Sequence, residues 1–564
     1  MDYATYYSNN RRPEPDRKNA DTEWSENLDG FSTYRASSAP PSTPSEAVWR
    51  MVEVPVLLSL IGISSALVSY LTGAVLALEN GVKHQLEGTL DDHFMWAAYC
   101  AYCVSMGLFA CFITHLICPE ATGGGLSNMK TILGGVVKPV LLSKRLILAK
   151  VLGLWFSLMA GLSVGREGPF VHISGAIADQ FMKLSCFQHL RRQDSKRLEI
   201  IQCACASGVA ATFGNAFGGV LFSIEFTASA YMVRTLPKAF LTSVVALVTF
   251  VFLGAGESLS LFGDEPQLAT KLPEMYELGV FVSIGLLGSF LGVIFVSLVE
   301  VLMGFRNRLL DKRKFSPAII MRRKYLMVGT VSFLVAATMY YELATVPHTG
   351  SGSFEMLTFL FRKELFSADL KKRLWVFVVY KFFITLFSVT LPLPVGLFSP
   401  VFVVGGVLGR LVGEALHTYT VYKSYAPWEY ALLGAAAFST GVTRGISTAV
   451  IIFELACQPQ LGLPIAIVVL TAHFTGNRFS KNVYEVLMDA SGDPYMDELP
   501  QSQYTVPVEE VMLPITEYHV LALDSTYRDA QMLLDATEAS RTGLGKYSSN
   551  GVYVEEYSEE EDEG

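Results

Sequence analysis

Long apolar segments alternate with short polar segments along most of the chain. A transmembrane helix needs roughly 20 predominantly apolar residues to cross the hydrocarbon core of a bilayer. Several segments reach that length, and we therefore predict an all-α polytopic membrane protein. The apolar segments are Val54–Leu78, Phe94–Cys118, Leu146–Leu162, Val280–Val301, Tyr325–Tyr341, Val376–Val404, Tyr430–Ile452 and Leu463–Phe474.

Glycine and proline interrupt this apolar pattern at Gly123–Gly125, Gly165–Pro169, Gly350–Gly352 and Pro392–Pro400. Backbone that leaves the helix at membrane depth is tolerated only where it lines a cavity or is buried in protein. Such interruptions are also a sequence indication of a transporter's binding site. Gly350–Gly352 fits a loop between helices. The interruptions that end at Pro169 and Pro400 have apolar sequence on both sides, so they are candidates for a binding site.

Composition and charge agree with a membrane protein. Of the 564 residues, 51% are hydrophobic and 17% are charged, against roughly a quarter charged in ordinary soluble chains. The mean hydropathy is +0.38. Much of the net charge of −9 lies in the acidic end, residues 555–563. Under the positive-inside rule, we expect some of the short basic connections to face the cytoplasm. These connections are Arg191–Arg197, Arg306–Lys314, Arg322–Lys324 and Lys371–Arg373.

The polar ends of the chain set the predicted domain boundaries. Residues 1–47 are polar, charged and rich in proline and serine, which predicts a disordered cytosolic tail without a cleavable signal peptide. Residues 48–490 form the predicted membrane domain. Residues 491–548 have mixed strand-like and helical patterning, typical of a small β–α unit, and the acidic residues 549–564 predict a disordered tail.

Little in the sequence indicates an enzyme. Cys100 and Cys103 lie one turn apart in an apolar segment, with no second pair or nearby histidine to complete a metal site, so we interpret them as packing residues. Gly123–Gly125 lacks the βαβ context of a nucleotide-binding loop. HExxH and comparable spacings are absent among the nine histidines. We predict no enzymatic activity, no metal site, no cofactor and no nucleic-acid partner.

The segment Ser163–Ile173 (SVGREGPFVHI) carries the main candidate for chemistry. Glu167 lies between glycines, beside Arg166 and just before Pro169. Proline suits the first turn of a helix, and the free N–H groups there attract an anion. A glutamate at this place can itself occupy the anion's position, as a tethered plug released by protonation or by competing anions. The alternative is a charged first turn at the membrane surface, although ionisable groups within membrane segments are functional candidates by default.

The segment Val395–Pro400 (VGLFSP) repeats this pattern without a charge. Gly396 permits a bend, and Pro400 opens another apolar helix. In this interpretation the amides of Leu397 and Phe398 point at a common site. A simple turn at the start of a helix is the alternative.

Several motifs in one order resemble segments of a known family. They are GREGP at Gly165–Pro169, GVLFSIEF at Gly219–Phe226, GSGSFEML at Gly350–Leu357, GLFSP at Gly396–Pro400 and ISTAVIIFEL at Ile446–Leu455. GREGP and GLFSP look like two of the three signature motifs of the CLC family of chloride channels and transporters. The resemblance covers essentially the whole membrane region and is closest to the eukaryotic channel-type branch.

The resemblance implies a fold and an activity. Members of the family are homodimers with one anion pathway per subunit, built from inverted helical repeats. Their re-entrant half-helices point their N-termini at a chloride near the middle of the bilayer. We therefore expect a CLC-type inverted-repeat bundle in the lipid bilayer, chloride or a similar anion as the transported ligand, and a homodimer. The plasma membrane is the expected location, with an intracellular membrane as the alternative.

The resemblance also implies roles for single residues. Glu167 matches the gating glutamate of the family. The backbone amides of Arg166, Glu167 and Gly168 match the external anion site. The amides of Leu397 and Phe398 match the central anion site.

The central site departs from the family pattern. Tyr484, in NVYEVL, matches the family's tyrosine whose hydroxyl coordinates the central anion. The first family motif, normally GSGIP, is GGGLS at Gly123–Ser127, so Gly124 replaces the coordinating serine and Ser127 replaces the proline. We expect weaker anion binding and an altered preference between chloride and nitrate, unless Ser127 or a backbone amide supplies the missing donor.

A second departure concerns protons. The family's exchangers carry an inner glutamate that relays protons, and the matching position, just after Glu225, is Phe226. A phenyl ring binds no proton, and the family's channels also lack this carboxylate. We interpret Glu225 as a hydrogen-bonded structural group. The prediction is a gated chloride channel with passive transport. A coupled chloride/proton exchanger is the alternative, and a non-conducting membrane scaffold is the remote one.

The polar C-terminal segment also resembles part of the family. Val508–Met512 (VEEVM) and its continuation are similar to the opening of the cytoplasmic CBS-domain pair of eukaryotic members. Only part of one unit is visible before the sequence becomes acidic. We therefore expect a partial CBS-like α/β segment without a complete nucleotide site.

Overall fold

The computed structural model describes residues 44–87, 92–136, 138–227, 233–254, 273, 275–311, 314–343, 353–419, 425–456 and 458–492. The chain divides into two compact units, Met1–Tyr495 and Met496–Gly564. The second unit, Gly350–Gly352 and residues 1–43 of the predicted N-terminal tail lie outside the described residues. The CBS-like segment and the acidic tail therefore stay predictions.

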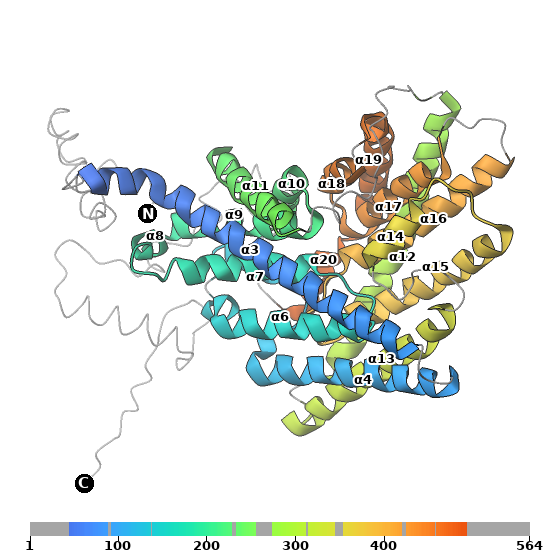
Figure 1. Ribbon diagram of the computed structural model, residues 1–564, viewed down its shortest axis with the longest axis horizontal. Coiled ribbons are helices and arrows are strands. Elements are labelled where there is room, and N and C mark those ends of the chain that lie inside the picture. Colours follow the sequence, from blue (N-terminus) through green and yellow to red (C-terminus); the bar gives the residue numbers. More distant parts are fainter. Residues whose placement is uncertain are drawn as a thin grey trace, which may run out of the picture. The chain divides into compact units, whose positions relative to one another are not determined.

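The described part of the chain consists of helices and the turns between them (Figure 1). The first helices are α3 (Pro44–Glu87), α4 (Asp92–Ile117), α5 (Leu126–Leu133), α6 (Lys144–Met159), α7 (Glu167–Phe181), α8 (Gln188–Arg192), α9 (Asp194–Phe213), α10 (Ala216–Thr227) and α11 (Leu236–Phe252). The later ones are α12 (Met275–Leu309), α13 (Pro317–Leu343), α14 (Ser353–Leu360), α15 (Ala368–Val389), α16 (Phe398–Tyr419), α17 (Pro427–Thr443), α18 (Ser447–Ala456), α19 (Gly462–Phe479) and α20 (Val483–Ser491). Short 3₁₀ turns are η2 (Pro119–Ala121), η3 (Pro139–Leu142), η4 (Val233–Thr235) and η6 (Pro459–Leu461).

Six helical spans in these ranges are long and apolar enough to cross a membrane. They are Val52–Gly81, Phe94–Ile117, Val233–Phe252, Met275–Leu309, Phe398–Tyr419 and Pro459–Ser491. The prediction of an all-α multi-pass membrane protein is confirmed. The first helix begins at Pro44, before the predicted start of the membrane domain at Val48, because proline is well suited to the first turn of a helix.

Two apolar segments that look continuous in the sequence are each two helices. The segment Val376–Val404 is divided because the backbone between α15 and α16 passes through Pro392 and Pro394, which lack the N–H that a helix needs. The segment Tyr430–Ile452 is divided between α17 and α18 at Arg444. This residue has a φ of 62°, a left-handed conformation that ends the helix.

Several helices are too short to cross a bilayer. α5, α7, α10 and α18 contain 8, 15, 12 and 10 residues, against roughly 20 for a full span. α7 begins at the interrupted segment Gly165–Pro169, and most of its residues are buried. A helix that is covered on all sides lies inside the protein rather than in lipid, so the interruption marks a half-helix that begins within the molecule.

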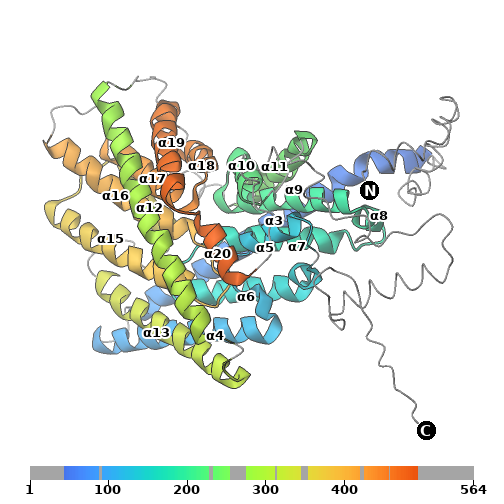
Figure 2. The ribbon, with the colours of Figure 1, turned by 180° about the vertical axis from the view of Figure 1, so that it is seen from behind.

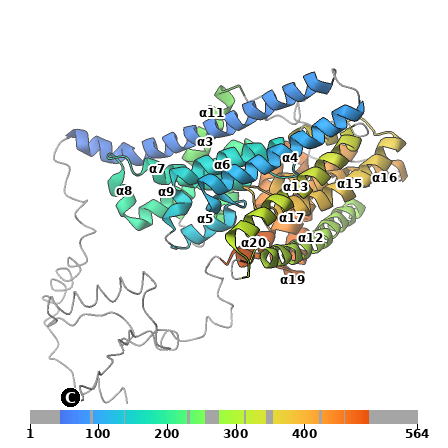
Figure 3. The same ribbon diagram turned by 90° about the horizontal axis from the view of Figure 1, so that it is seen from below.

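Two pairs of helices near the interrupted segments pack closely. α7 packs against α9, and α16 packs against α17. Small residues let membrane helices approach closely: a Cβ added to Gly434 of α17 would lie 2.4 Å from the Cα of Gly409 of α16. From behind, α20 lies beside α5 and α12 (Figure 2), while α3 runs along α11 on another side (Figure 3).

Candidate functional site

An isolated β-bridge joins the two interrupted segments that the sequence analysis singled out. The N–H of Gly165 donates to the carbonyl of Gly396 at 2.8 Å, and the N–H of Gly396 donates to the carbonyl of Gly165 at 2.9 Å. A Cβ on Gly396 would lie 2.9 Å from that Gly165 oxygen, so a side chain there would force the two loops apart. The bridge therefore brings the starts of α7 and α16 together.

Glu167 lies at this junction as the first residue of α7. Its side chain is 2% exposed. The hydroxyl of Ser399, in the first turn of α16, donates to its Oε1. Its Oε2 is buried and has no hydrogen-bond partner among the described residues. The carboxylate thus spans the gap between two helix starts.

The backbone around Glu167 provides a positive environment. The first helical bond of α7 runs from the N–H of Phe170 to the carbonyl of Arg166, so the earlier amides have no acceptor within the helix. Helix N-termini of this kind favour negative charge. The guanidinium of Arg166 points elsewhere and donates to the carbonyl of Thr212 at 3.4 Å, so Arg166 contributes to this end of α7 through its backbone.

A cavity of about 250 Å³ lies beside the bridge. Five of the residues predicted to bind an anion line it: Gly124, Gly168, Leu397, Phe398 and Tyr484. Arg166 and Glu167 are not among its lining residues; they lie just beyond it, next to Gly168. The structure therefore brings the predicted residues into one region, with the cavity on one side and the Glu167 carboxylate on the other.

The Gly123–Gly125 loop forms another wall of the cavity. Gly123 and Gly125 have φ values of 81° and 85°, which side chains rarely adopt. The N–H of Gly123 donates to the carbonyl of Leu393 at 2.8 Å, and a Cβ on Gly168 would lie 3.0 Å from the Gly124 oxygen. All three motif loops therefore meet through their backbones. Ser127 and Asn128, in the first turn of α5, add polar side chains to the same wall.

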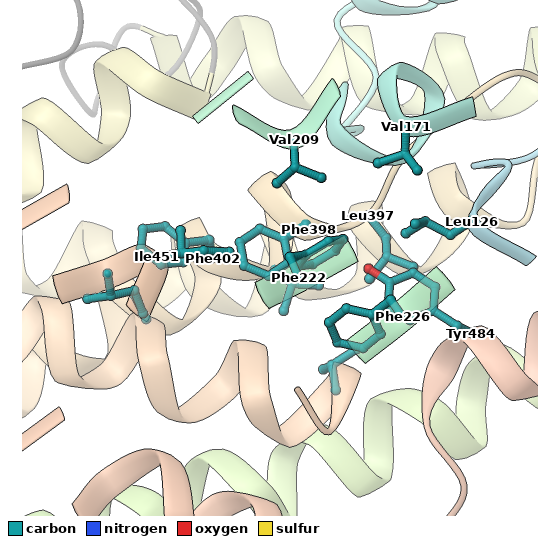
Figure 4. Close-up of a cluster of buried hydrophobic side chains, with 14 of the residues drawn as sticks. Leu126, Val171, Val209, Phe222, Phe226, Leu397, Phe398, Phe402, Ile451 and Tyr484 are labelled. Atoms are coloured by element: carbon teal, nitrogen blue, oxygen red, sulfur yellow. The ribbon is translucent and has the colours of Figure 1, made fainter. Parts of the chain in front are cut away.

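Tyr484 approaches the cavity from α20. The Asn482 side chain caps this helix and accepts from the N–H of Glu485 at 2.8 Å. Tyr484 is 9% exposed, and Phe226 is 8% exposed. Their ring centroids lie 5.1 Å apart in an edge-to-face arrangement, which is a favourable geometry for aromatic pairs. Figure 4 shows the two rings close together, with Leu397 and Phe398 nearby.

Two basic residues that line the cavity were not predicted as site residues. Arg306, near the end of α12, donates from Nη1 to the carbonyl of Thr390 at 3.2 Å. The Nζ of Lys324, on α13, lies 2.8 Å from Nε2 of His115. The lining of this cavity includes no aspartate or glutamate among the described residues. Both basic residues belong to clusters that were visible in the sequence, but the clusters indicated only membrane orientation.

The other polar candidates have a packing role. Cys100 and Cys103 are buried in α4 and pack with Ala336 and Trp96. No group of three or more potential metal ligands occurs within the described ranges.

Taken together, these features define a multi-pass membrane protein with a buried cavity at converging helix N-termini, a fold in which half-helices surround a polar interior. Residues 106–477 match the family described as "Voltage gated chloride channel". The chain belongs to this family, and the resemblance seen in the sequence is confirmed.

Relatives and solved structures agree with this assignment. Chloride channel protein 2 of Cavia porcellus is 31% identical over 556 residues, which cover 90% of this chain and 60% of that protein. Chloride channel protein 1 of Homo sapiens is 30% identical over 542 residues, covering 86% of this chain and 53% of that protein. The chain thus spans about 60% or less of the length of these relatives.

Two solved structures share the fold. The crystal structure of a eukaryotic CLC transporter superimposes with a TM-score of 0.71 at 29% identity, covering 87% of this chain and 84% of that chain. A slow cyanobacterial Cl⁻/H⁺ antiporter gives a TM-score of 0.65 at 16% identity, covering 78% of this chain and 97% of that chain. The predicted CLC-type fold is therefore confirmed.

Proposed function

We propose that this chain is a gated anion channel that conducts chloride passively, with Glu167 as its gate. The observation that carries the proposal is the Glu167 carboxylate, which lies between the starts of α7 and α16 beside the cavity. Backbone donors at helix starts stabilise an anion without a fixed cation in the site. Such a site binds an ion strongly enough to admit it and weakly enough to release it.

Roles for the other site residues follow from this arrangement. Amides of Arg166, Glu167 and Gly168 bind an external anion when the carboxylate moves away. Amides of Leu397 and Phe398 bind a central one. The hydroxyl of Tyr484 completes the central site, since it is the phenol that borders the cavity.

Passive conduction is the favoured form of transport. Phe226 stands where an exchanger of this family has its inner glutamate, and its ring is packed against Tyr484. The relatives described above are named as channels. The two solved structures described above are those of a transporter and an antiporter, so coupled chloride/proton exchange is the alternative.

The gate is tested by Glu167→Gln, which removes the charge and keeps the size of the side chain. We expect constitutive anion conductance with little dependence on external pH, measured by patch recording. Glu53→Gln is a matched control, because Glu53 is also buried in a membrane helix but contacts His189 rather than the start of α16. If the Glu167 variant gates and responds to pH as the wild type does, the assignment of Glu167 as the gate is refuted.

The mode of transport is tested in reconstituted vesicles. With a channel, an imposed chloride gradient drives chloride flux and no uphill movement of protons. Proton uptake against the proton gradient that stops when chloride is removed would reject the channel and favour the coupled chloride/proton exchanger. If neither halide nor nitrate crosses the membrane, even with Glu167→Gln, the non-conducting membrane scaffold is the interpretation that remains.

We also propose the homodimer. Phe217, Leu221 and Glu225 follow one another at four-residue spacing on α10 and are all exposed in the single chain. Glu225 is exposed on this face even though its two oxygens accept backbone hydrogen bonds. An exposed carboxylate is costly next to lipid, so coverage of this face by a second copy is favourable. Photobleaching of labelled single complexes in a bilayer tests this: two bleaching steps are expected, and a single step would exclude the dimer.

A further inference from the structure

Two glutamates bind the starts of each other's helices in α10 and α18. Glu225, near the end of α10, accepts from the N–H of Ile446 at 2.7 Å through Oε1. Its Oε2 accepts from the N–H of Ser447 at 2.8 Å. These two amides belong to the beginning of α18.

Glu454, near the end of α18, makes the reciprocal contacts. Its Oε1 accepts from the N–H of Phe217 at 3.2 Å, and its Oε2 accepts from the N–H of Gly218 at 2.7 Å. These amides lie in the first turn of α10. The two short helices are therefore joined at both ends by a carboxylate, and we call the two sets of contacts the Glu225 clamp and the Glu454 clamp.

Both clamps meet the same physical need. The first amides of a helix have no acceptor within the helix, and little water reaches them in a membrane. A carboxylate satisfies two such donors at once, with hydrogen bonds strengthened by its charge. As stabilising contacts, the two clamps are close to equivalent.

Neither clamp lines the anion cavity, but the Glu225 clamp is linked to a lining residue, Tyr484, through the ring of Phe226. Phe226 follows Glu225 directly, and its ring packs on the turn before α18: a Cβ on Gly445 would lie 2.3 Å from the ring and 3.2 Å from Oε2 of Glu225. The same ring contacts Tyr484 edge to face at 5.1 Å. At the other clamp, Phe217 is 59% exposed, and its ring contacts Phe240, which does not line the cavity.

We infer that Glu225 is a positioning residue for the anion site. By fixing the start of α18, it holds the Phe226 ring against Gly445, and this ring in turn fixes the direction in which Tyr484 presents its hydroxyl to the cavity. The inference rests on the proposed function of Tyr484. It also gives a reason for a phenyl ring at residue 226 other than the loss of a proton relay.

The matched pair Glu225→Gln and Glu454→Gln separates this role from stability. Each variant weakens one clamp by removing its charge. The melting temperature of the purified protein in detergent should therefore fall by a similar amount in both variants. Chloride affinity, measured by isothermal titration calorimetry, should fall roughly threefold to tenfold in Glu225→Gln. It should stay at the wild-type value in Glu454→Gln.

A double-mutant cycle with Tyr484→Phe tests the route of the effect. If Glu225 acts through the phenol, Glu225→Gln should cause no further loss of affinity once the hydroxyl is absent. Should Glu225→Gln fail to fold, Phe226→Leu takes its place in the cycle, because it keeps both hydrogen bonds of the clamp and removes the ring contact. It carries the same expectation of weaker chloride binding.

Three results would overturn the inference: equal losses of affinity in the two glutamine variants, no loss in Glu225→Gln, or additive losses in the Tyr484→Phe background. Calorimetry reports binding rather than transport, so the test is distinct from that of the proposed function. Chloride binding without flux would reject the channel and leave the positioning role measurable. Wild-type protein that binds no chloride would reject the positioning role as well.

Discussion

Gly124 presents only backbone to the cavity, at a position where the resemblance places a serine hydroxyl in other family members. A Cβ at this residue would lie 3.2 Å from the carbonyl of Val395, so a small side chain requires a shift of a few tenths of an ångström. Ser127 and Asn128 border the same cavity, but they lie in the helix that follows the loop. The proposed central site therefore has fewer hydroxyl donors close to the start of α16 than the family pattern implies.

Gly124→Ser should strengthen chloride binding roughly fivefold, because one hydrogen bond contributes about 1 kcal/mol. Calorimetric titration of the purified protein with chloride and with nitrate measures both affinity and preference. Gly124→Ala is the control, since it adds the same Cβ without a hydroxyl. Equal affinities in the two variants would show that the hydroxyl does not reach the anion.

Single residues differ in how well the sequence revealed them. The place of Glu167 at a helix start was predictable from physical reasoning, because an acid between glycines before a proline indicates such a start, whereas its proposed role as a gate comes from the resemblance. Tyr484 was found only through the resemblance, since a tyrosine late in an apolar region is usually an interface anchor. Arg306 and Lys324 were visible as parts of basic clusters, but which cavity they border depends on how α12 and α13 pack.

The backbones of α16 and α17 approach each other closely. This contact bears on the site because α16 begins at the cavity. The contact depends on glycine at both surfaces: a Cβ on Gly434 would lie 2.4 Å from the Cα of Gly409. By contrast, a Cβ on Gly406 would meet the ends of the Leu360 and Leu357 side chains at 3.4 and 3.7 Å and the carbonyl of Ala431 at 3.8 Å, which leaves room for a methyl group. Gly434 of α17 and Gly406 of α16 therefore differ sharply in whether they tolerate a side chain.

Gly434→Ala should lower the free energy of unfolding by about 3 kcal/mol, because it overpacks a backbone contact that cannot yield without separating the helices. Gly406→Ala should be close to neutral or slightly stabilising, since alanine also favours the helix. Thermal melting of the two purified variants in one detergent measures the difference. Equal melting temperatures would show that α16 and α17 are less closely packed than the structure describes.

Helix boundaries were the part of the fold least accessible from the sequence. Apolar length predicted the long helices such as α4 and α12, because a bilayer fixes the number of residues that a span needs. The division between α17 and α18 was not visible, since it depends on Arg444 in a left-handed conformation. Gly445 follows Arg444 directly, but a single glycine inside an apolar segment is not enough to show that a helix ends there.

At the scale of the whole molecule, the charges around the cavity have one sign. Arg306 and Lys324 line it, and no acidic residue does so within the described ranges. A cleft with one sign of charge and walls of low dielectric raises the local concentration of the opposite ion. Under the positive-inside rule we expect these basic residues to face the cytoplasm, so we predict that the proposed channel gathers chloride from that side.

Arg306→Gln should reduce outward chloride movement roughly threefold at low ionic strength, with a smaller deficit at higher salt, because the screening length falls from about 30 Å at 0.01 M to about 8 Å at 0.15 M. Recordings from excised patches, with ionic strength varied at constant chloride, measure this dependence. Arg308→Gln removes the same charge from an exposed position on α12 that does not line the cavity. Its effect should be smaller at every salt concentration. Equal losses in the two variants, or a loss from Arg306→Gln that does not change with salt, would mean that the arginine acts by local packing rather than through the field of the cavity.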